Sequence, residues 1–462
     1  MNAKDPLQIA IQELKNNVIT GKTLEFNWRI EQLNRIDNLL SNNQNDIINS
    51  LYKDLGKSKI ESLSEILLIK EEIILVKKKL KSWMRPNTYK TPIYLYPTFS
   101  KVTFEPLGCV LILGPYNYPL LYILKPLVNI FSAGNTALIK PSEKCPNTSR
   151  LIKKLINKYF PNDTLIVIEG DRKIAKKLVN QKFDHIFFTG STETGKSIMK
   201  SASKNLIPLT LELSGANPVI IFKNANLKVA AKRIVWGKFF NSGQSCMAPN
   251  HIFIEESIEE NLIKEIKKTI HSFYGKKVIQ SETLSKLEKQ QFLQASQLLK
   301  KLKRDKRIIF GGLTSKKNFK ISPTIVKVDN ENDFILRQEL FSPILPIMSF
   351  RKYQTALEII QKSSKPLAIY IFGGNKKIHK YISDSTSSGT ICINDVLLPV
   401  LIPNLPFGGV GLSGMGKFHG EEGFRNFSNQ KSITYKTNFL DLWLRYPPYK
   451  NILKLIQVIF KI

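Results

Sequence analysis

Cys246 is the residue whose setting best suits covalent chemistry. It follows a glycine turn in the sequence GQSC, in a loop between Gly243 and Pro249. A lone cysteine is more often a small buried apolar side chain than a nucleophile, and this loop setting separates Cys246 from the other three cysteines. A thiol with a pKa near 8.5 is only about 3% ionised at pH 7, so a nucleophilic cysteine needs help from neighbouring groups.

Glu212 lies within TLELSG, in an otherwise apolar stretch that is predicted to be a strand. A carboxylate there is costly unless it is paired or takes part in a reaction, and burial would raise its pKa toward that of a useful general base. The alternative is that strand alternation turns the side chain to solvent on an edge strand. Spacing alone leaves both interpretations open.

A third segment, residues 190–197, reads GSTETGKS and matches the phosphate-loop pattern GxxxxGK[ST] after the strand-like HIFFT. By itself the pattern indicates a nucleoside triphosphatase, but it is short and chance matches are common. In either case, a glycine turn that leads from a parallel strand into a helix is a good place to bind a phosphate.

The elements that must position these residues follow from apolar periodicity. The first part of the chain is predicted to be helical, most clearly at residues 60–83. Pro86 and Pro92 end this pattern, and residues 93–104 (IYLYPTFSKVTF) are predicted to form two strands around Pro97.

Short β-branched runs then alternate with helical segments. The predicted strands GCVLILG, TALIK, LIVIEG, HIFFTG and LTLEL begin at residues 108, 136, 165, 185 and 209. This alternation predicts an α/β fold with a doubly wound parallel sheet, whose ligands bind at the carboxyl ends of the strands. A second α/β region begins near residue 217 with NPVIIF, followed by a helix at 227–240 and a glycine-dense loop at 405–416.

The composition is globular, with 42% hydrophobic and 23% charged residues. A net charge of +32 could indicate a nucleic-acid or anionic-membrane partner, but the lysines are spread along nearly every segment, which favours a solvated basic surface. No secretory signal and no membrane span are predicted. The widely separated cysteines favour a reduced cytoplasm and no metal site; they are Cys109, Cys145, Cys246 and Cys392.

An ordered set of motifs resembles the aldehyde dehydrogenase superfamily from about Leu7 to Tyr435. The set comprises PYNYP at 115–119, KPSE at 140–143, FTGST at 188–192, TLELSG at 210–215, GQSC at 243–246 and QELFSP at 338–343. Further segments are similar to the class 3 branch, which includes fatty aldehyde dehydrogenases. These are IVWGKFFNSGQSCMAPN, SSGTICINDV, LPFGGVGLSGMGKFHG and RYPP at 445–448.

The resemblance implies a catalytic role for three residues. Cys246 would form a thiohemiacetal with an aldehyde, and the Asn117 amide with the Cys246 backbone N–H would hold the developing oxyanion, at about 3 kcal/mol per donor. After oxidation to a thioester, Glu212 would activate the hydrolytic water.

The same resemblance implies residues for NAD or NADP and for the substrate. The cofactor residues would be Lys140 and Glu143 at the adenosine ribose, Gly190, Ser191 and Gly195 at the pyrophosphate turn and its helix, and Glu339 and Phe341 at the nicotinamide ribose and ring. Tyr118, Asn394 and Phe407 would line the substrate mouth. Glu143 should repel a 2′-phosphate, which slightly favours NAD over NADP.

Four residues depart from the family pattern. Ser214 and Ala216 replace a glycine and a common lysine beside the base, Tyr116 stands where tryptophan is frequent, and Ser342 replaces a glycine. None removes a reacting group, but the added side chain of Ser214 narrows the space in which Glu212 could swing.

The family also implies a domain layout. An NAD(P)-binding domain would comprise residues 1–87 and 106–212, a catalytic domain 213–424, a bridging or oligomerisation β element 88–105 and 425–445, and an amphipathic tail 446–462. A homodimer is expected. In the tail, Lys450, Lys454, Gln457 and Lys461 would form one polar stripe on a helix, which suits peripheral contact with a membrane or docking onto protein. Membrane contact would favour long-chain aldehydes as substrates.

Three other functions remain open at this point. A CoA-acylating dehydrogenase would share the cysteine and the cofactor, but it would not need the water-activating Glu212. A triphosphatase would need a magnesium-binding aspartate at the end of a neighbouring strand, and no convincing one is present. A basic nucleic-acid-binding protein would leave the set of Cys246, Glu212 and Asn117 without a role, so no nucleic-acid partner is expected.

Overall fold

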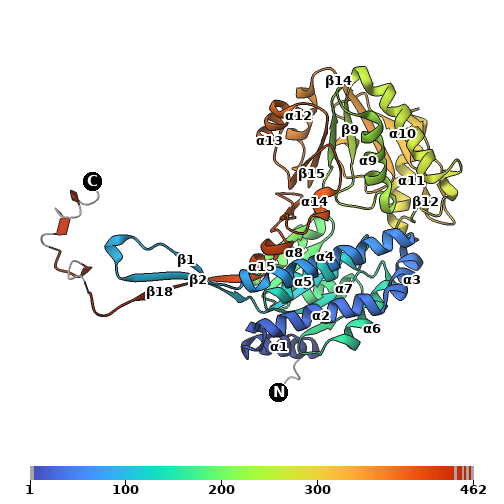
Figure 1. Ribbon diagram of the computed structural model, residues 1–462. Helices are drawn as coiled ribbons and strands as arrows, with labels where there is room; N and C mark the ends of the chain where they lie inside the picture. Colours follow the sequence, from blue (N-terminus) through green and yellow to red (C-terminus); the bar gives the residue numbers. More distant parts are fainter. Residues whose placement is uncertain (1–4, 442–444, 450–451, 454–456, 459–462) are drawn as a thin grey trace. The chain divides into compact units, whose positions relative to one another are not determined.

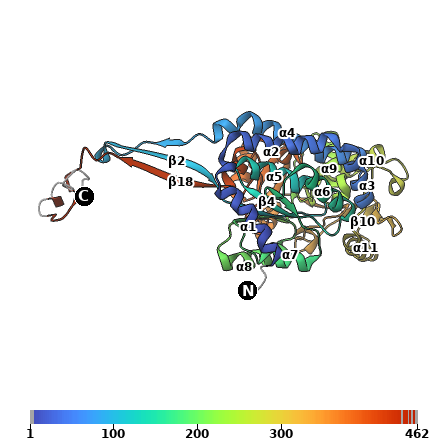
Figure 2. The same ribbon diagram turned by 90° about the horizontal axis from the view of Figure 1, so that it is seen from below.

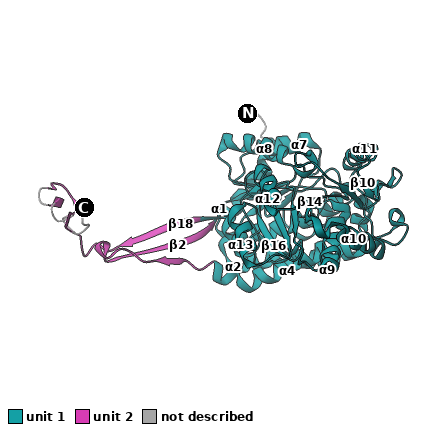
Figure 3. Ribbon diagram, turned by 90° about the horizontal axis from the view of Figure 1, so that it is seen from above, with its two compact units in different colours: residues 1–83, 106–429 teal, residues 84–105, 430–462 magenta. Residues whose placement is uncertain are grey.

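The computed structural model describes residues 5–441, 445–449, 452–453 and 457–458 (Figure 1). The chain divides into two compact units, one of residues 1–83 and 106–429 and one of residues 84–105 and 430–462 (Figure 3). The first unit contains two large sheets, the small two-stranded sheet β11-β12, and all of the predicted site residues.

The first sheet confirms the predicted strand starts to within a residue. Its order is β17-β7-β6-β3-β4-β5, parallel except for β17. The strands are β3 (Cys109–Leu113), β4 (Thr136–Lys140), β5 (Leu165–Val167), β6 (His185–Thr189), β7 (Leu209–Glu212) and β17 (Gly414–Met415). β3 and β4 are buried throughout, as expected for strands covered on both faces.

Helices cover both faces of this sheet, as Figure 2 shows with α4 and α5 on one side and α7 and α8 on the other. Cys109, Leu111 and Leu113 alternate along β3 and pack in one apolar cluster with residues of α1, α7 and α8. The helices are α1 (Pro6–Ile19), α2 (Phe26–Asn42), α3 (Gln44–Leu55), α4 (Lys59–Trp83), α5 (Leu121–Ser132), α6 (Pro146–Tyr159), α7 (Arg172–Val179) and α8 (Thr192–Ala202).

The second sheet has the order β10-β13-β14-β9-β8-β15-β16, parallel except for β10. Its strands are β8 (Pro218–Ile221), β9 (His251–Glu255), β10 (Ile308–Phe310), β13 (Thr324–Lys327), β14 (Ile344–Phe350), β15 (Ala368–Phe372) and β16 (Thr390–Ile393). Its helices are α9 (Leu227–Phe239), α10 (Glu259–Tyr274), α11 (Lys289–Arg304), α12 (Tyr353–Lys362) and α13 (Lys376–Ser385). Shorter elements are β11 (Thr314–Ser315), β12 (Lys320–Ile321), α14 (Leu398–Leu401) and α15 (Gly420–Asn426).

The second unit contains the three-stranded sheet β1-β2-β18, with β1 (Asn87–Tyr89), β2 (Thr98–Pro106) and β18 (Ser428–Lys436). The prediction of two strands within residues 93–104 is wrong in its first half. Ile93–Leu95 forms a 3₁₀ turn, and the strand that pairs with β2 on this side is β1. Pro92 and Pro97 bracket the turn, and because proline lacks an N–H, the segment is a poor partner for a hydrogen-bonded ladder.

None of the described helices is both long and apolar enough to cross a membrane. The predicted stripe of Lys450, Lys454, Gln457 and Lys461 lies outside the described residues, apart from Gln457. The predicted helix at 60–83 is confirmed as α4.

Candidate active site

A cavity of about 990 Å³ opens at the carboxyl ends of the first sheet's strands. This is the position where parallel α/β sheets bind their ligands, and the volume is at the upper end of that of ligand pockets. It is lined by side chains of both sheet regions. The predicted site residues along its wall are Asn117, Lys140, Glu143, Gly190, Ser191, Glu212, Cys246, Glu339 and Phe341.

The Cys246 loop begins with an unusual backbone. Asn241, Ser242 and Gly243 all have positive φ, at 51°, 54° and 78°. Non-glycine residues resist this left-handed region by roughly 1–2 kcal/mol each, so the surroundings must hold it. The Asn241 side-chain amide donates to the carbonyls of Asn117 (2.9 Å) and Gln244 (3.2 Å). A Cβ at Gly243 would lie 2.5 Å from the Ser342 carbonyl oxygen, so only glycine fits there.

The Cys246 thiol is buried, with 7% of the residue exposed. Burial, together with smaller effects of Glu212 and Glu339, raises the pKa of this thiol to about 12, although a hydrogen bond with Tyr122 lowers it. The Tyr122 hydroxyl oxygen lies 3.5 Å from the sulfur. The resting thiol is therefore protonated, and the tyrosine is a polar neighbour able to favour the thiolate.

Glu212 is the last residue of β7 and is 2% exposed. The interpretation that it faces solvent on an edge strand is wrong, because β17 pairs alongside β7 and the side chain reaches the cavity. Neither carboxylate oxygen has a hydrogen-bond partner among the described residues. Burial raises the pKa of Glu212 well above its ordinary value, and only Lys417 opposes that shift. An unpartnered buried carboxylate facing a cavity is suited to accept a proton from a ligand.

Asn117 follows β3 and is almost fully buried. Its amide nitrogen donates to the Gln244 carbonyl at 3.1 Å, which ties the residue to the cysteine loop. An amide carries two N–H hydrogens, so a second donor is left for a group in the cavity. The loop is also tied on its other side, since the Asn217 amide donates to the Cys246 carbonyl at 2.7 Å.

The other end of the cavity has groups suited to a dinucleotide. Lys140 ends β4 and pairs with Glu143. Ser191 caps α8, and its hydroxyl accepts from the Thr194 N–H at 3.3 Å, so the cavity wall includes a helix N-terminus that attracts phosphate. Glu339 is half-buried, and the loss of water around its carboxylate raises its pKa to about 7, although hydrogen bonds from the Ser214 hydroxyl and the Gly215 N–H lower it.

The geometry of residues 190–197 argues against a phosphate loop of the triphosphatase kind. α8 already begins at Thr192, and the Lys196 ammonium pairs with Glu193 at 2.8 Å on the exposed surface of the helix. Gly195 instead serves packing, because a Cβ there would lie 2.7 Å from the Leu213 side chain.

The chain was compared with protein families, with curated proteins and with solved structures. The model of the aldehyde dehydrogenase family matches residues 3–433. The chain is 39% identical to the 4,4'-diaponeurosporen-aldehyde dehydrogenase of Staphylococcus aureus, over 96% of both chains. The chain belongs to the aldehyde dehydrogenase family. It is therefore an oxidoreductase that acts on aldehydes, and the resemblance seen in the motifs is confirmed.

Other relatives agree with this assignment. Aldehyde dehydrogenase family 3 member A2 of Rattus norvegicus is 36% identical over 95% of this chain and 90% of that protein. A solved structure of the substrate-bound state of Staphylococcus aureus AldH matches with a TM-score of 0.95 at 37% identity, covering 99% of this chain and all of the other. Betaine aldehyde dehydrogenase from the same species, in complex with NAD⁺, matches with a TM-score of 0.84 at 25% identity over 95% and 89% of the two chains.

In this aldehyde dehydrogenase, the residues predicted for the substrate mouth do not line the cavity. Tyr118 is buried, and the Lys57 ammonium lies 4.1 Å from the centre of its ring. Phe407 is buried with its ring stacked on His419, at 5.1 Å between ring centres. Asn394 accepts from the Gly373 N–H at 3.0 Å, which is a turn-stabilising contact.

Several residues of the aldehyde dehydrogenase site carry no signal in the sequence. Tyr122 lies in an apolar helix, so nothing marks its hydroxyl as a neighbour of Cys246. Lys238 is fully buried, and burial lowers its pKa to about 7 while Glu339 opposes that shift. Ser214, which the sequence predicts to narrow the space beside Glu212, also forms a hydrogen bond with the Glu339 carboxylate.

Proposed function

We propose that this enzyme oxidises aldehydes to carboxylic acids with NAD or NADP, through a covalent intermediate on Cys246 that Glu212 helps to hydrolyse. The observation that carries the proposal is one cavity whose wall includes Cys246, Glu212 and Asn117 together with Lys140, Ser191 and Glu339. Groups for covalent attack, for proton transfer and for a dinucleotide thus border a single space.

The steps follow from the chemistry of these side chains. The Cys246 thiol releases its proton to water as the sulfur bonds to the aldehyde carbon, and the Asn117 amide donates to the oxyanion that forms. A nicotinamide dinucleotide bound in the cavity would supply the two-electron acceptor for the oxidation of this thiohemiacetal. The product is a thioester on Cys246. The Glu212 carboxylate then takes a proton from water, the water oxygen attacks the thioester carbon, and the acid leaves as the thiol is restored.

Hydrolysis is favoured over transfer of the acyl group to CoA. Glu212 faces the cavity with both oxygens unpartnered among the described residues, which suits a water-activating base. An acyl transfer to a thiol would not require this buried carboxylate.

The finer assignments follow from the site and its relatives. Glu143 disfavours a 2′-phosphate, but its pairing with Lys140 weakens that preference, so NAD is favoured only slightly. One Staphylococcus aureus relative is named a 4,4'-diaponeurosporen-aldehyde dehydrogenase, and several motifs are similar to the branch that includes fatty aldehyde dehydrogenases. Together they favour medium- to long-chain or aromatic aldehydes for this enzyme. A homodimer formed through the second unit, a cytoplasmic location and peripheral membrane contact through the tail complete the proposal.

The test compares the wild type with a Cys246→Ser variant. Aldehydes of increasing chain length are supplied with NAD or NADP, and reduced nicotinamide and carboxylic acid are both measured without CoA. The proposal expects equal amounts of the two products from the wild type and neither from the variant. A wild type that needs CoA, or that oxidises no aldehyde in the series, would refute it.

A further inference from the structure

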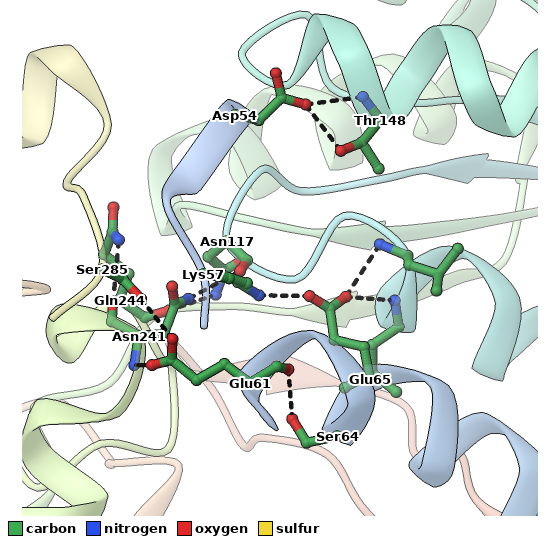
Figure 4. A network of polar contacts seen from close by, with 12 residues as sticks. Asp54, Lys57, Glu61, Ser64, Glu65, Asn117, Thr148, Asn241, Gln244 and Ser285 are labelled. Atoms are coloured by element: carbon green, nitrogen blue, oxygen red, sulfur yellow. Dashed lines mark hydrogen bonds and ion pairs between the residues drawn. The ribbon is translucent and has the colours of Figure 1, made fainter. Parts of the chain in front are cut away.

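Two glutamates one turn apart on α4 contact both loops that carry the proposed reaction. Glu61 and Glu65 are fully buried, although neither lines the cavity. Figure 4 shows the Glu61 carboxylate beside Asn241 and the Glu65 carboxylate beside Lys57. Residues four apart on a helix lie on the same face, so one turn of α4 presents both carboxylates together.

Glu61 holds the cysteine loop at its strained start. One of its carboxylate oxygens accepts from the backbone N–H of Asn241 at 2.7 Å. The other accepts from the Ser58 N–H at 2.9 Å and from the Ser285 hydroxyl at 2.7 Å. Asn241 is the first residue of the left-handed run that leads to Cys246. The carboxylate therefore fixes the backbone where this run begins.

Glu65 holds the other loop. One oxygen accepts from the N–H groups of Leu120 and Leu121, at 3.2 and 2.9 Å, and the other pairs with the buried Lys57. α5 has no capping side chain of its own, so this carboxylate caps it from another helix. Asn117 lies just before this helix start, and Tyr122 lies in its first turn.

A third set of contacts joins the two loops directly. The Asn241 amide donates to the Asn117 carbonyl, and the Asn117 amide donates to the Gln244 carbonyl. Gln244 in turn accepts from the Glu288 N–H at 3.0 Å and donates to the Lys286 carbonyl at 2.9 Å. The nucleophile loop and the oxyanion loop thus form one unit with the α4 turn.

We infer that Glu61 and Glu65 are positioning residues that set the Cys246 sulfur relative to the Asn117 amide and the Tyr122 hydroxyl. The inference rests on the proposed function for the roles of Cys246 and Asn117. It adds that the geometry of attack depends on two carboxylates that touch no substrate.

Replacement by glutamine is a sharp test because neither site tolerates it. Each oxygen of Glu61 faces a backbone N–H, so the new NH₂ group must face a donor that cannot rotate away. At Glu65 the NH₂ group must face either the Lys57 ammonium or the two N–H groups of α5. Shape is conserved at both positions while the hydrogen bonding is broken.

The first readout is alkylation of Cys246 by iodoacetamide across pH, followed by mass spectrometry, which needs no aldehyde oxidation. Loss of a hydrogen bond to a charged group predicts a rate at least about tenfold lower in Glu61→Gln and Glu65→Gln. The second readout is turnover of hexanal with NAD, where kcat should fall by a similar factor while KM for NAD changes less than about twofold.

Two glutamates of the same helix provide matched controls. Glu71 is exposed, so Glu71→Gln should keep wild-type rates in both assays. Glu72 is buried and accepts from Asn129 and the Gly420 N–H, away from both loops, so Glu72→Gln should lower thermal stability but keep Cys246 reactivity. Ser285→Ala removes a single hydrogen bond to Glu61 and should also lower the rate of Cys246 alkylation.

Each outcome bears on the inference. Alkylation in the Glu61 and Glu65 variants that matches the Glu72→Gln variant would overturn it, since burial alone would then explain both carboxylates. If those variants do not fold, an unchanged rate in Ser285→Ala would overturn it instead. A wild type that oxidises no aldehyde refutes the proposed function, yet the alkylation series still decides whether the glutamates position the thiol.

Discussion

Glu212 combines a role in the proposed hydrolysis with an unfavourable environment for its charge. Its side chain is buried and has no hydrogen-bond partner in the described part of the chain, so burial raises its pKa above the ordinary value of 4.5. The folded state therefore retains a proton that the unfolded chain loses above pH 4.5. Wild-type stability should decrease as pH rises from 4.5 through the raised pKa.

For the Glu212→Gln variant we expect a change in stability and a change in turnover. The variant should be more stable than the wild type at pH 8, and the difference in Tm should shrink toward zero at pH 4.5. It should also stop after one turnover, with the acyl group left on Cys246 and visible in the intact mass. Full turnover, or a stability gain that is the same at both pH values, would contradict the assignment.

Tyr122 is the described side chain that supports the Cys246 thiolate by a direct hydrogen bond. Tyr122→Phe keeps the ring but removes the hydroxyl. Hydrogen bonds to charged groups contribute about 1.5–3 kcal/mol, so the thiol pKa should rise by about 1–2 units. The pH profile of iodoacetamide alkylation measures this shift, and an unchanged profile would exclude the role. Tyr118→Phe is the matched control on the neighbouring ring.

At the residue scale, the sequence predicted candidate catalytic residues that the structure brings to one cavity, but not the residues that hold their loops in place. Cys246, Glu212 and Asn117 lie in motifs whose order is visible along the chain, and the structure places all three on one cavity wall. Glu61 contacts Asn241 and Ser285 across 180 and 224 positions of sequence. Such contacts depend on how α4 packs, and nothing local marks a buried glutamate as a ligand of a distant loop.

At the scale of helices and strands, the sequence predicted most accurately the elements that are buried along their whole length. The strands of the first sheet are continuous apolar runs between turns, and their starts agree with the structure to within a residue. The error at Ile93–Leu95 arose because an alternating apolar and aromatic pattern also fits an exposed turn between prolines. The periodicity of side chains says nothing about missing N–H donors, which decide whether a ladder can form.

Helix α8 offers a prediction about the cofactor end of the site. Gly195 lets the helix approach Leu213, so Gly195→Val would force α8 away from the end of β7. Overpacking of this kind typically costs about 1–3 kcal/mol. Because Ser191 at the helix start lines the cavity, KM for NAD should rise about tenfold or more, on the order of the same free energy.

The matched control is Ala202→Val on the same helix, which is also buried but lies at the far end from Ser191. Cys246 alkylation should remain near the wild-type rate in both variants. An equal rise in KM for both would show that general loosening of α8, and not its N-terminus, determines dinucleotide binding.

On the scale of the whole molecule, the net charge of +32 and the basic tail lead to different predictions for binding to anionic surfaces. The spread of lysines predicts weak attraction to anionic surfaces by any exposed face. The tail predicts stronger binding. If it formed a helix, Lys450, Lys454 and Lys461 would share one polar stripe beside an apolar face. Both attractions should weaken with salt.

A triple variant distinguishes binding through the tail from binding through the overall charge. With vesicles that contain phosphatidylserine, each lysine near the surface contributes about 1 kcal/mol, so changing Lys450, Lys454 and Lys461 to glutamine should weaken binding about a hundredfold. A control triple with the same charge change replaces three exposed lysines elsewhere, Lys300, Lys303 and Lys316. Sedimentation with the vesicles should separate the two triples clearly. Equal loss in both would show that only the overall charge matters, and the tail would then be expected to dock on protein.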